Sequence, residues 1–232
     1  MKTIGVLGGM SWESTESYYR LLNEGVRERL GGHHSARIVM ISVDFAEIEA
    51  LQRAGDWVAA GRQLAEAARR VEAAGADCLL LATNTMHRVA PAISAAIDIP
   101  LLHIADGTGE RLMAAGIERV GLLGTRFTME QDFYRGRLAE RYGVTCLVPD
   151  APKRDQVHRI IFEELVQGVI SDVSRQNYRS IVASLEADGA QAIILGCTEI
   201  SLLLRPKDCD LPLYDTTALH VAMGLEYALR SV

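Results

Sequence analysis

The chain has 232 residues, of which 49% are hydrophobic and 23% charged, and its formal net charge at pH 7 is −6. That length is enough for one large domain or for two smaller lobes, each with a core. The chain has no cluster of Lys and Arg to neutralise phosphates and no apolar run of about 18 residues, so we expect no nucleic-acid partner and no membrane span. The opening MKTIGVLGGM lacks a signal-peptide pattern, which predicts a cytoplasmic protein with reduced cysteines.

Short apolar runs alternate with helix-length stretches along the whole chain. The predicted strands, in chain order, are 3–8, 37–43, 77–82, 100–104, 119–124, 144–148 and 192–196, with a further short strand in 211–215. Between the second and third strands, residues 56–74 carry apolar side chains at helical spacing. Alternation of this kind is typical of an α/β protein in which helices cover both faces of a parallel sheet.

An internal duplication is visible in three segments. VEAAGADCLLLATNT (71–85) aligns on LEADGAQAIILGCTE (185–199), IGVLGG (4–9) aligns on VGLLGT (120–125), and the pair Tyr19-Arg20 recurs as Tyr134-Arg135. The three offsets agree to within two residues. Strand–helix units resemble one another even without duplication, but that general resemblance does not explain the common offset. We therefore predict two pseudo-symmetric α/β lobes with an active site in the cleft between them. The first lobe is expected to comprise 1–99 and about 209–232, and the second 100–208.

Each copy of the duplication ends a strand at a polar tripeptide, Thr83-Asn84-Thr85 in one and Cys197-Thr198-Glu199 in the other. Ligands of open α/β sheets bind beyond the carboxyl ends of the strands, so Thr83 and Cys197 are expected on opposite sides of one cleft. A thiol before a helix start can be held as a thiolate, which makes Cys197 the candidate catalytic base. The alternative is a buried and inert cysteine.

The turn Gly8-Gly9-Met10-Ser11 closes the first strand, and Gly124-Thr125 is its counterpart in the second half. The turn lacks the third glycine of a dinucleotide fingerprint, but amides at a helix start favour an anion, so both turns are candidates for binding carboxylates. No set of His, Cys, Asp and Glu has a metal-site spacing. Lys2, Lys153 and Lys207 lie outside the strand-end motifs, which disfavours a pyridoxal Schiff base.

The segments IGVLGGMSWEST, ATNTMH and GCTE resemble the aspartate/glutamate racemase family, and the resemblance covers essentially the whole chain. It implies a two-lobed fold, a homodimer, and cofactor-independent racemisation of a small acidic amino acid, aspartate or glutamate or both. It also implies one catalytic side chain from each lobe on either side of the α-carbon. The residues that it assigns to substrate binding are Met10, Gln52, Asn84, Thr85, Thr125, Thr198 and Glu199, with Arg53 a weaker candidate.

One key position departs from the family pattern, because Thr83 stands where a cysteine is usual. A threonine hydroxyl is too weak an acid to serve as an alkoxide base near neutral pH, but it can donate a proton to a carbanion. We therefore expect chemistry that favours the L-enantiomer, with Cys197 as the base. Two alternatives remain: a single-cysteine decarboxylase, and a catalytically weak amino-acid-binding protein. Aspartate and glutamate differ by one methylene, which the sequence does not resolve.

Overall fold

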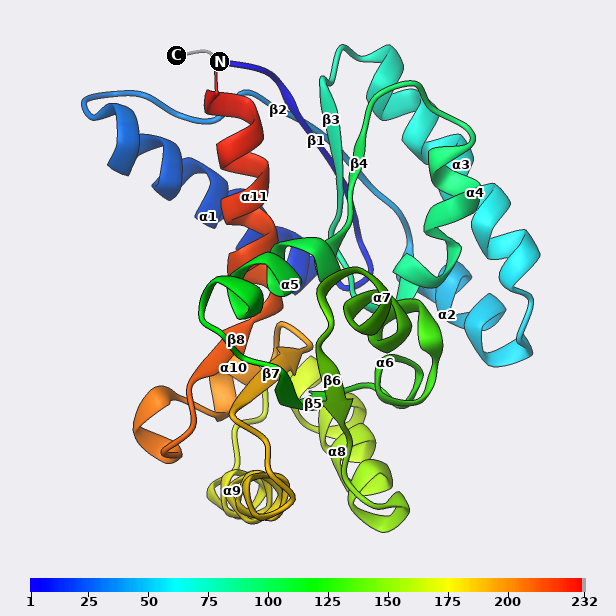
Figure 1. Ribbon diagram of the computed structural model, residues 1–232. Coiled ribbons are helices and arrows are strands. Elements are labelled where there is room, and N and C mark those ends of the chain that lie inside the picture. The colour runs from blue at the N-terminus through cyan, green and yellow to red at the C-terminus, as the bar shows by residue number, and fades with distance from the viewer. Residues whose placement is uncertain (231–232) are drawn as a thin grey trace. The chain divides into compact units, whose positions relative to one another are not determined.

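Strands form at all of the predicted apolar runs. Within residues 1–230, which the computed structural model describes, they build two parallel sheets with the orders β2-β1-β3-β4 and β6-β5-β7-β8 (Figure 1). The strands are β1 (Ile4–Gly8), β2 (Ile38–Ser42), β3 (Cys78–Leu81), β4 (Leu101–Leu102), β5 (Arg119–Gly124), β6 (Thr145–Leu147), β7 (Ala192–Gly196) and β8 (Leu213–Asp215). The second sheet repeats the order of the first, so the α/β fold with two similar halves is confirmed.

The first unit comprises Met1–Ile104 and the segment that begins at His220. Its helices are α1 (Trp12–Leu30), α2 (Phe45–Ala54), α3 (Trp57–Ala73), the 3-10 helix η1 (Thr85–Val89), α4 (Ala90–Ser94) and the greater part of α11 (Thr216–Leu229). The predicted helix 56–74 corresponds to α3. Its N-cap is Asp56, whose side chain accepts the Ala59 N–H at 2.9 Å.

The second unit comprises Ala105–Leu219. Its helices are α5 (Ile104–Ala114), α6 (Arg126–Glu130), α7 (Asp132–Tyr142), α8 (Ala151–Glu163), α9 (Asp172–Ala187), α10 (Ile200–Leu203) and the 3-10 helices η2 (Leu165–Gln167) and η3 (Pro206–Asp208). The first turn of α11 also belongs to this unit, so α11 is shared by both.

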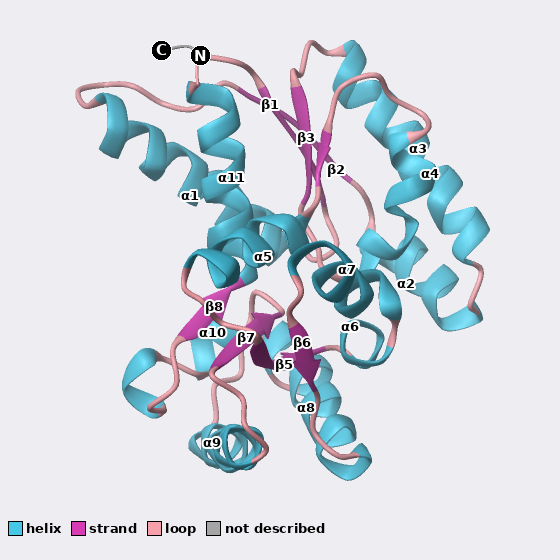
Figure 2. Ribbon diagram, in the orientation of Figure 1, coloured by secondary structure: helices cyan, strands magenta, loops and turns pink. Residues whose placement is uncertain are grey.

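The first sheet is buried on both faces, as its apolar runs require. Along β3, Cys78 and Leu80 join a cluster with α1 and α11, whereas Leu79 and Leu81 join a second cluster with α2, α3 and α4. Figure 2 shows the same division, with α1 and α11 on one side of the sheet and α3 and α4 on the other. Alternate side chains of one strand thus supply two cores. None of the helices described in residues 1–230 is long and apolar enough to cross a bilayer.

The boundaries between the units differ from those expected at 99 and about 209. Strand β4 pairs with β3, so it completes the first sheet instead of opening the second unit. Strand β8 pairs with β7, so residues 213–215 complete the second sheet and do not return to the first. The chain leaves the first unit after Ile104 and returns at His220. Both errors have one cause, because a short edge strand carries no sequence signal for the sheet that it joins.

Burial raises the pKa of Cys78 from 9.0 to about 12. The folded state therefore keeps this proton at a pH where the unfolded chain loses it, so the thiol's contribution to stability is intact below pH 9 and is lost as pH rises toward 12. Urea denaturation measures the free energy of unfolding of wild type and of Cys78→Ala. We expect the difference between the two to shrink by about 1 kcal/mol per pH unit above pH 9. A gap independent of pH over that range would contradict this assignment.

Candidate active site

In the first unit, the polar tripeptide lies beside the glycine turn. Strands β1 and β3 are neighbours, with Leu7 opposite Leu81, and the Ala82 N–H donates to the Leu7 carbonyl at 2.9 Å. The residues that follow these two strands therefore share one edge of the sheet. Thr83 is half-buried there, and its N–H donates to the Leu81 carbonyl at 2.8 Å.

The glycine turn is shaped by a close backbone contact. Gly9 has a φ of 92°, and a Cβ at this position would lie 2.1 Å from the Val43 carbonyl oxygen, so only glycine fits. Its N–H donates to Thr15 Oγ1 at 2.8 Å, so this amide is already used within the protein, contrary to the expectation that it binds a carboxylate. The Met10 side chain is buried in the core with Ile48, which leaves only the Met10 backbone for a substrate.

Gln52 and Arg53 lie on α2 but differ in direction. Gln52 is buried, and its Nε2 donates to the sulfur of Met86 at 2.9 Å, so it lies beside the segment that follows Thr83. The Arg53 side chain is 74% exposed and pairs with Glu49 at 3.0 Å. The structure therefore brings Gln52, but not Arg53, to the tripeptide.

In the second unit, two glycines bring the corresponding residues together. Gly124 and Gly196 are register partners at the ends of β5 and β7, and a Cβ on Gly196 would lie 2.9 Å from the Leu123 carbonyl oxygen. Thr125 and Cys197 follow these glycines at the same edge of the sheet. Thr125 is buried and caps α6 by accepting the Thr128 N–H at 3.4 Å.

Cys197 is half-buried, and its thiol donates to Glu199 Oε2 at 2.8 Å. Burial of the thiol raises the pKa of Cys197 well above its ordinary value, and the negative charge of Glu199 raises it further. The expectation that a helix start holds a thiolate is therefore wrong, since α10 has only four residues and a carboxylate faces the sulfur. In this structure Cys197 is a thiol at neutral pH.

The Cys197–Glu199 segment is attached to the first turn of α11. Thr217 Oγ1 donates to Thr198 Oγ1 at 3.3 Å, and the Ser201 hydroxyl donates to the Thr198 carbonyl at 2.8 Å. Asp215 accepts the Thr217 N–H at 2.8 Å and so holds that turn in place. These contacts stabilise Thr198 beside Cys197.

Three buried histidines of the first unit form a cluster, and one of them, His87, contacts Thr83. His87 Nδ1 lies 2.7 Å from the Thr83 carbonyl oxygen, and the His87 ring contacts the rings of His103 and His220. His87 lies in the ATNTMH segment, but no sequence pattern indicated that His220 would lie beside it. No motif links His220 to the other two, because it lies 117 positions after His103 in the chain.

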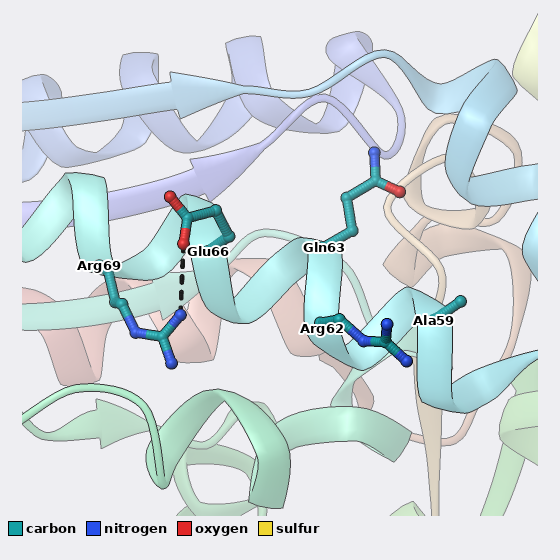
Figure 3. Close-up of a pocket in the computed structure, with 5 residues that line it drawn as sticks. All are labelled: Ala59, Arg62, Gln63, Glu66 and Arg69. Atoms are coloured by element: carbon teal, nitrogen blue, oxygen red, sulfur yellow. Dashed lines mark hydrogen bonds and ion pairs between the residues drawn. The ribbon is translucent and has the colours of Figure 1, made fainter.

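A surface hollow elsewhere is lined by five residues of α3 alone (Figure 3): Ala59, Arg62, Gln63, Glu66 and Arg69. Glu66 and Arg69 pair with each other at 3.2 Å, and neither is buried. The hollow contains none of the predicted site residues. Within residues 1–230 no group of three or more His, Cys, Asp and Glu side chains could hold a metal ion.

Comparison with known proteins gives consistent matches. The family model described as Asp/Glu/Hydantoin racemase matches residues 7–224. The crystal structure of a Yersinia pestis protein with a proposed Asp/Glu racemase function is 53% identical, with a TM-score of 0.94 and coverage of 99% of this chain and 100% of that one. An aspartate racemase homologue from Pyrococcus horikoshii is 33% identical, with a TM-score of 0.86 and coverage of 98% and 99%.

A curated relative is more distant. The broad specificity amino-acid racemase RacX of Bacillus subtilis is 22% identical over 164 residues, which cover 68% of this chain and 67% of that protein. The match to the family model includes the strand-end motifs, since residues 7–224 contain both Thr83 and Cys197.

Proposed function

Because the chain belongs to the Asp/Glu/Hydantoin racemase family, we propose that it is a cofactor-independent racemase of aspartate, glutamate or both. The observation that carries the proposal is the equivalence of Thr83 and Cys197. Each follows the third strand of its own sheet, β3 or β7, and the two sheets have the same strand order. We propose that the two sheet edges enclose one substrate, with these side chains on opposite faces of its α-carbon.

In the proposed reaction Cys197 is the base for the L-enantiomer. The thiol first transfers its proton to Glu199, to which it is already hydrogen-bonded. The positive α-ammonium group of a bound substrate favours this step, because a nearby cation lowers the pKa of a thiol. The thiolate then takes the α-hydrogen, and its electron pair passes to the α-carbon and carboxylate. Thr83 protonates the opposite face and regains a proton from water, and the hydroxide that remains takes the proton from Glu199, so that the thiol, the carboxylate and the hydroxyl are all restored.

The remaining predicted residues bind the substrate in this proposal. Asn84, Thr85, Thr198 and the Met10 backbone would hold the α-carboxylate and the ammonium group, and Gln52 and Thr125 would contact the distal carboxylate. Gln52 and Thr125 are both buried, so each contact with a carboxylate would be shielded from water. Glu199, expected to bind substrate, is assigned to the thiol because its carboxylate accepts from Sγ.

Replacing Glu199 separates thiol reactivity from catalysis. Glu199→Gln removes the charge that raises the pKa of Cys197, so alkylation of Cys197 by iodoacetamide at pH 8 should accelerate. Racemisation should nevertheless fall about 10²-fold, because the proton acceptor is lost. Peptide mass spectrometry measures the alkylation, and Cys209 in the same sample is the control. Slower alkylation together with unchanged racemisation would contradict the role given to Glu199.

Incubation with L-aspartate and L-glutamate in deuterium oxide tests the proposed function. NMR follows loss of the α-proton signal, and chiral chromatography follows the D-enantiomer. We expect exchange and D-product with at least one of the two substrates. Binding of both amino acids with neither exchange nor D-product would leave the chain an amino-acid-binding protein and refute the proposal.

One observation favours a second candidate function. A thiol with a raised pKa is a proton donor, which is what a single-cysteine decarboxylase uses to protonate an enediolate after carbon dioxide has left. The same incubation with a substituted malonate distinguishes the two. Release of carbon dioxide without racemisation of either amino acid would establish the decarboxylase.

We also propose that the enzyme is a homodimer, as the family resemblance implies, and that it is cytoplasmic. Light scattering during gel filtration should give twice the chain mass of 25.4 kDa. Cell fractionation of the producing organism should recover the protein with cytoplasmic markers.

A further inference from the structure

His87 connects two segments of the first unit through both nitrogens of its ring. Nδ1 lies 2.7 Å from the Thr83 carbonyl oxygen, which can only accept, so Nδ1 carries the proton. Nε2 lies 3.1 Å from the Ile104 N–H, which can only donate, so Nε2 is the acceptor. The contacts therefore fix His87 as a neutral imidazole in one tautomer, and the ring joins the end of β3 to the start of α5.

His220, as a neutral ring, has the opposite tautomer. Its Nε2 lies 2.7 Å from the Leu102 carbonyl oxygen and must donate, so in the neutral ring Nδ1 accepts from the Tyr18 hydroxyl at 2.7 Å. The His220 ring lies 5.7 Å from that of His87, measured between centroids, and both residues are buried. The ring of His103, which directly precedes Ile104, also packs against His87, with 4.5 Å between the ring centroids. Packing and hydrogen bonds thus hold the His87 ring in one orientation.

These contacts determine the backbone of Thr83. Its N–H donates to the Leu81 carbonyl, and its carbonyl accepts from His87, so both of its backbone polar groups are bonded. Threonine is β-branched and has few χ1 rotamers, so a fixed backbone also restricts the direction of the hydroxyl. Loss of the His87 bond would free the carbonyl and allow the hydroxyl to move.

We propose that His87 is a positioning residue that aims the Thr83 hydroxyl, and thereby controls proton delivery to one face of the substrate but not removal of the proton from the other. This inference rests on the proposed racemase function. It predicts that loss of the His87 bond lowers inversion of the substrate more than exchange of its α-proton. A purely structural role would lower exchange and inversion together, because both need a folded site.

Two variants of similar polarity distinguish the hydrogen bonds. In His87→Asn the side-chain amide can still donate to the Thr83 carbonyl, whereas in His87→Gln the longer side chain can reach Ile104 in place of Nε2 and leaves Thr83 unbonded. We measure deuterium incorporation into L-substrate and formation of D-product in the same sample. His87→Gln should lower inversion relative to exchange by about 10- to 100-fold, and His87→Asn should restore the wild-type ratio.

A second measurement does not depend on turnover. Nitrogen-15 NMR should show a proton on Nδ1 of His87 and on Nε2 of His220, and the carbonyl carbon-13 shift of Thr83 should change in His87→Gln but not in His87→Asn. Equal loss of exchange and inversion in both variants, or an unmoved Thr83 carbonyl shift, would overturn the role of His87 while the racemase proposal stands. Wild-type protein that catalyses neither process would instead refute the proposed function, and with it this role.

Discussion

Cys197→Ser should abolish racemisation of L-aspartate and L-glutamate, with a fall in kcat of about 10³-fold or more. A serine hydroxyl can keep the hydrogen bond to Glu199, but it cannot lose its proton at a comparable cost, so no base remains on this face. Exchange of the α-proton of the L-substrate should disappear together with inversion. Coupled enantiomer assays and proton NMR measure the two losses.

The matched control is Cys209→Ser. Cys209 Sγ donates to the Leu211 carbonyl at 3.5 Å, a bond that a hydroxyl can also make, and Cys209 lies outside the strand-end motifs. This variant should keep wild-type activity. If Cys197→Ser retained more than about a tenth of wild-type exchange, Cys197 could not be the principal base.

Thr83→Cys should raise kcat for the D-enantiomer by about 10²-fold or more. A thiol ionises near pH 8.5, far more readily than a hydroxyl, so position 83 gains a group that can remove the α-proton of D-substrate. The equilibrium constant of a racemisation is one, so kcat/KM must remain equal for the two enantiomers. The wild-type preference therefore appears as unequal kcat and KM values, and in the variant these values should converge.

Thr83→Ser is the control for this substitution, because it keeps a hydroxyl and removes only a methyl group. We expect this variant to retain the preference for L-substrate. Unchanged D-turnover in Thr83→Cys, with Cys197 still active on the L-enantiomer, would contradict the placement of Thr83 at the opposite face of the α-carbon.

The strands and the repeated topology could be predicted because they follow from local patterns. Apolar runs give β1, β3, β5 and β7, and the duplicated segments predict that the two sheets are alike, as their common strand order shows. The edge strands β4 and β8 could be located, but not assigned to a sheet. Their partners are chosen by long-range pairing, which their few residues do not encode.

The positions of the candidate catalytic residues were also predictable from local patterns. Thr83 and Cys197 end repeated strands, so position alone identifies them. The protonation state of Cys197 was not predictable, because it depends on burial and on the rotamer of Glu199. The contact of His220 with His87 was not predictable either, because the expected return of the last segment to the first unit does not specify which of its side chains meets His87.

A crystal structure of Cys197→Ala with bound L-aspartate tests the central claim most directly. The account predicts one amino acid whose α-carbon lies about 3–4 Å from Thr83 Oγ1 and faces the Cβ of residue 197 from the other side. An amino acid bound against only one of these residues, with the other directed into a separate pocket, would contradict it.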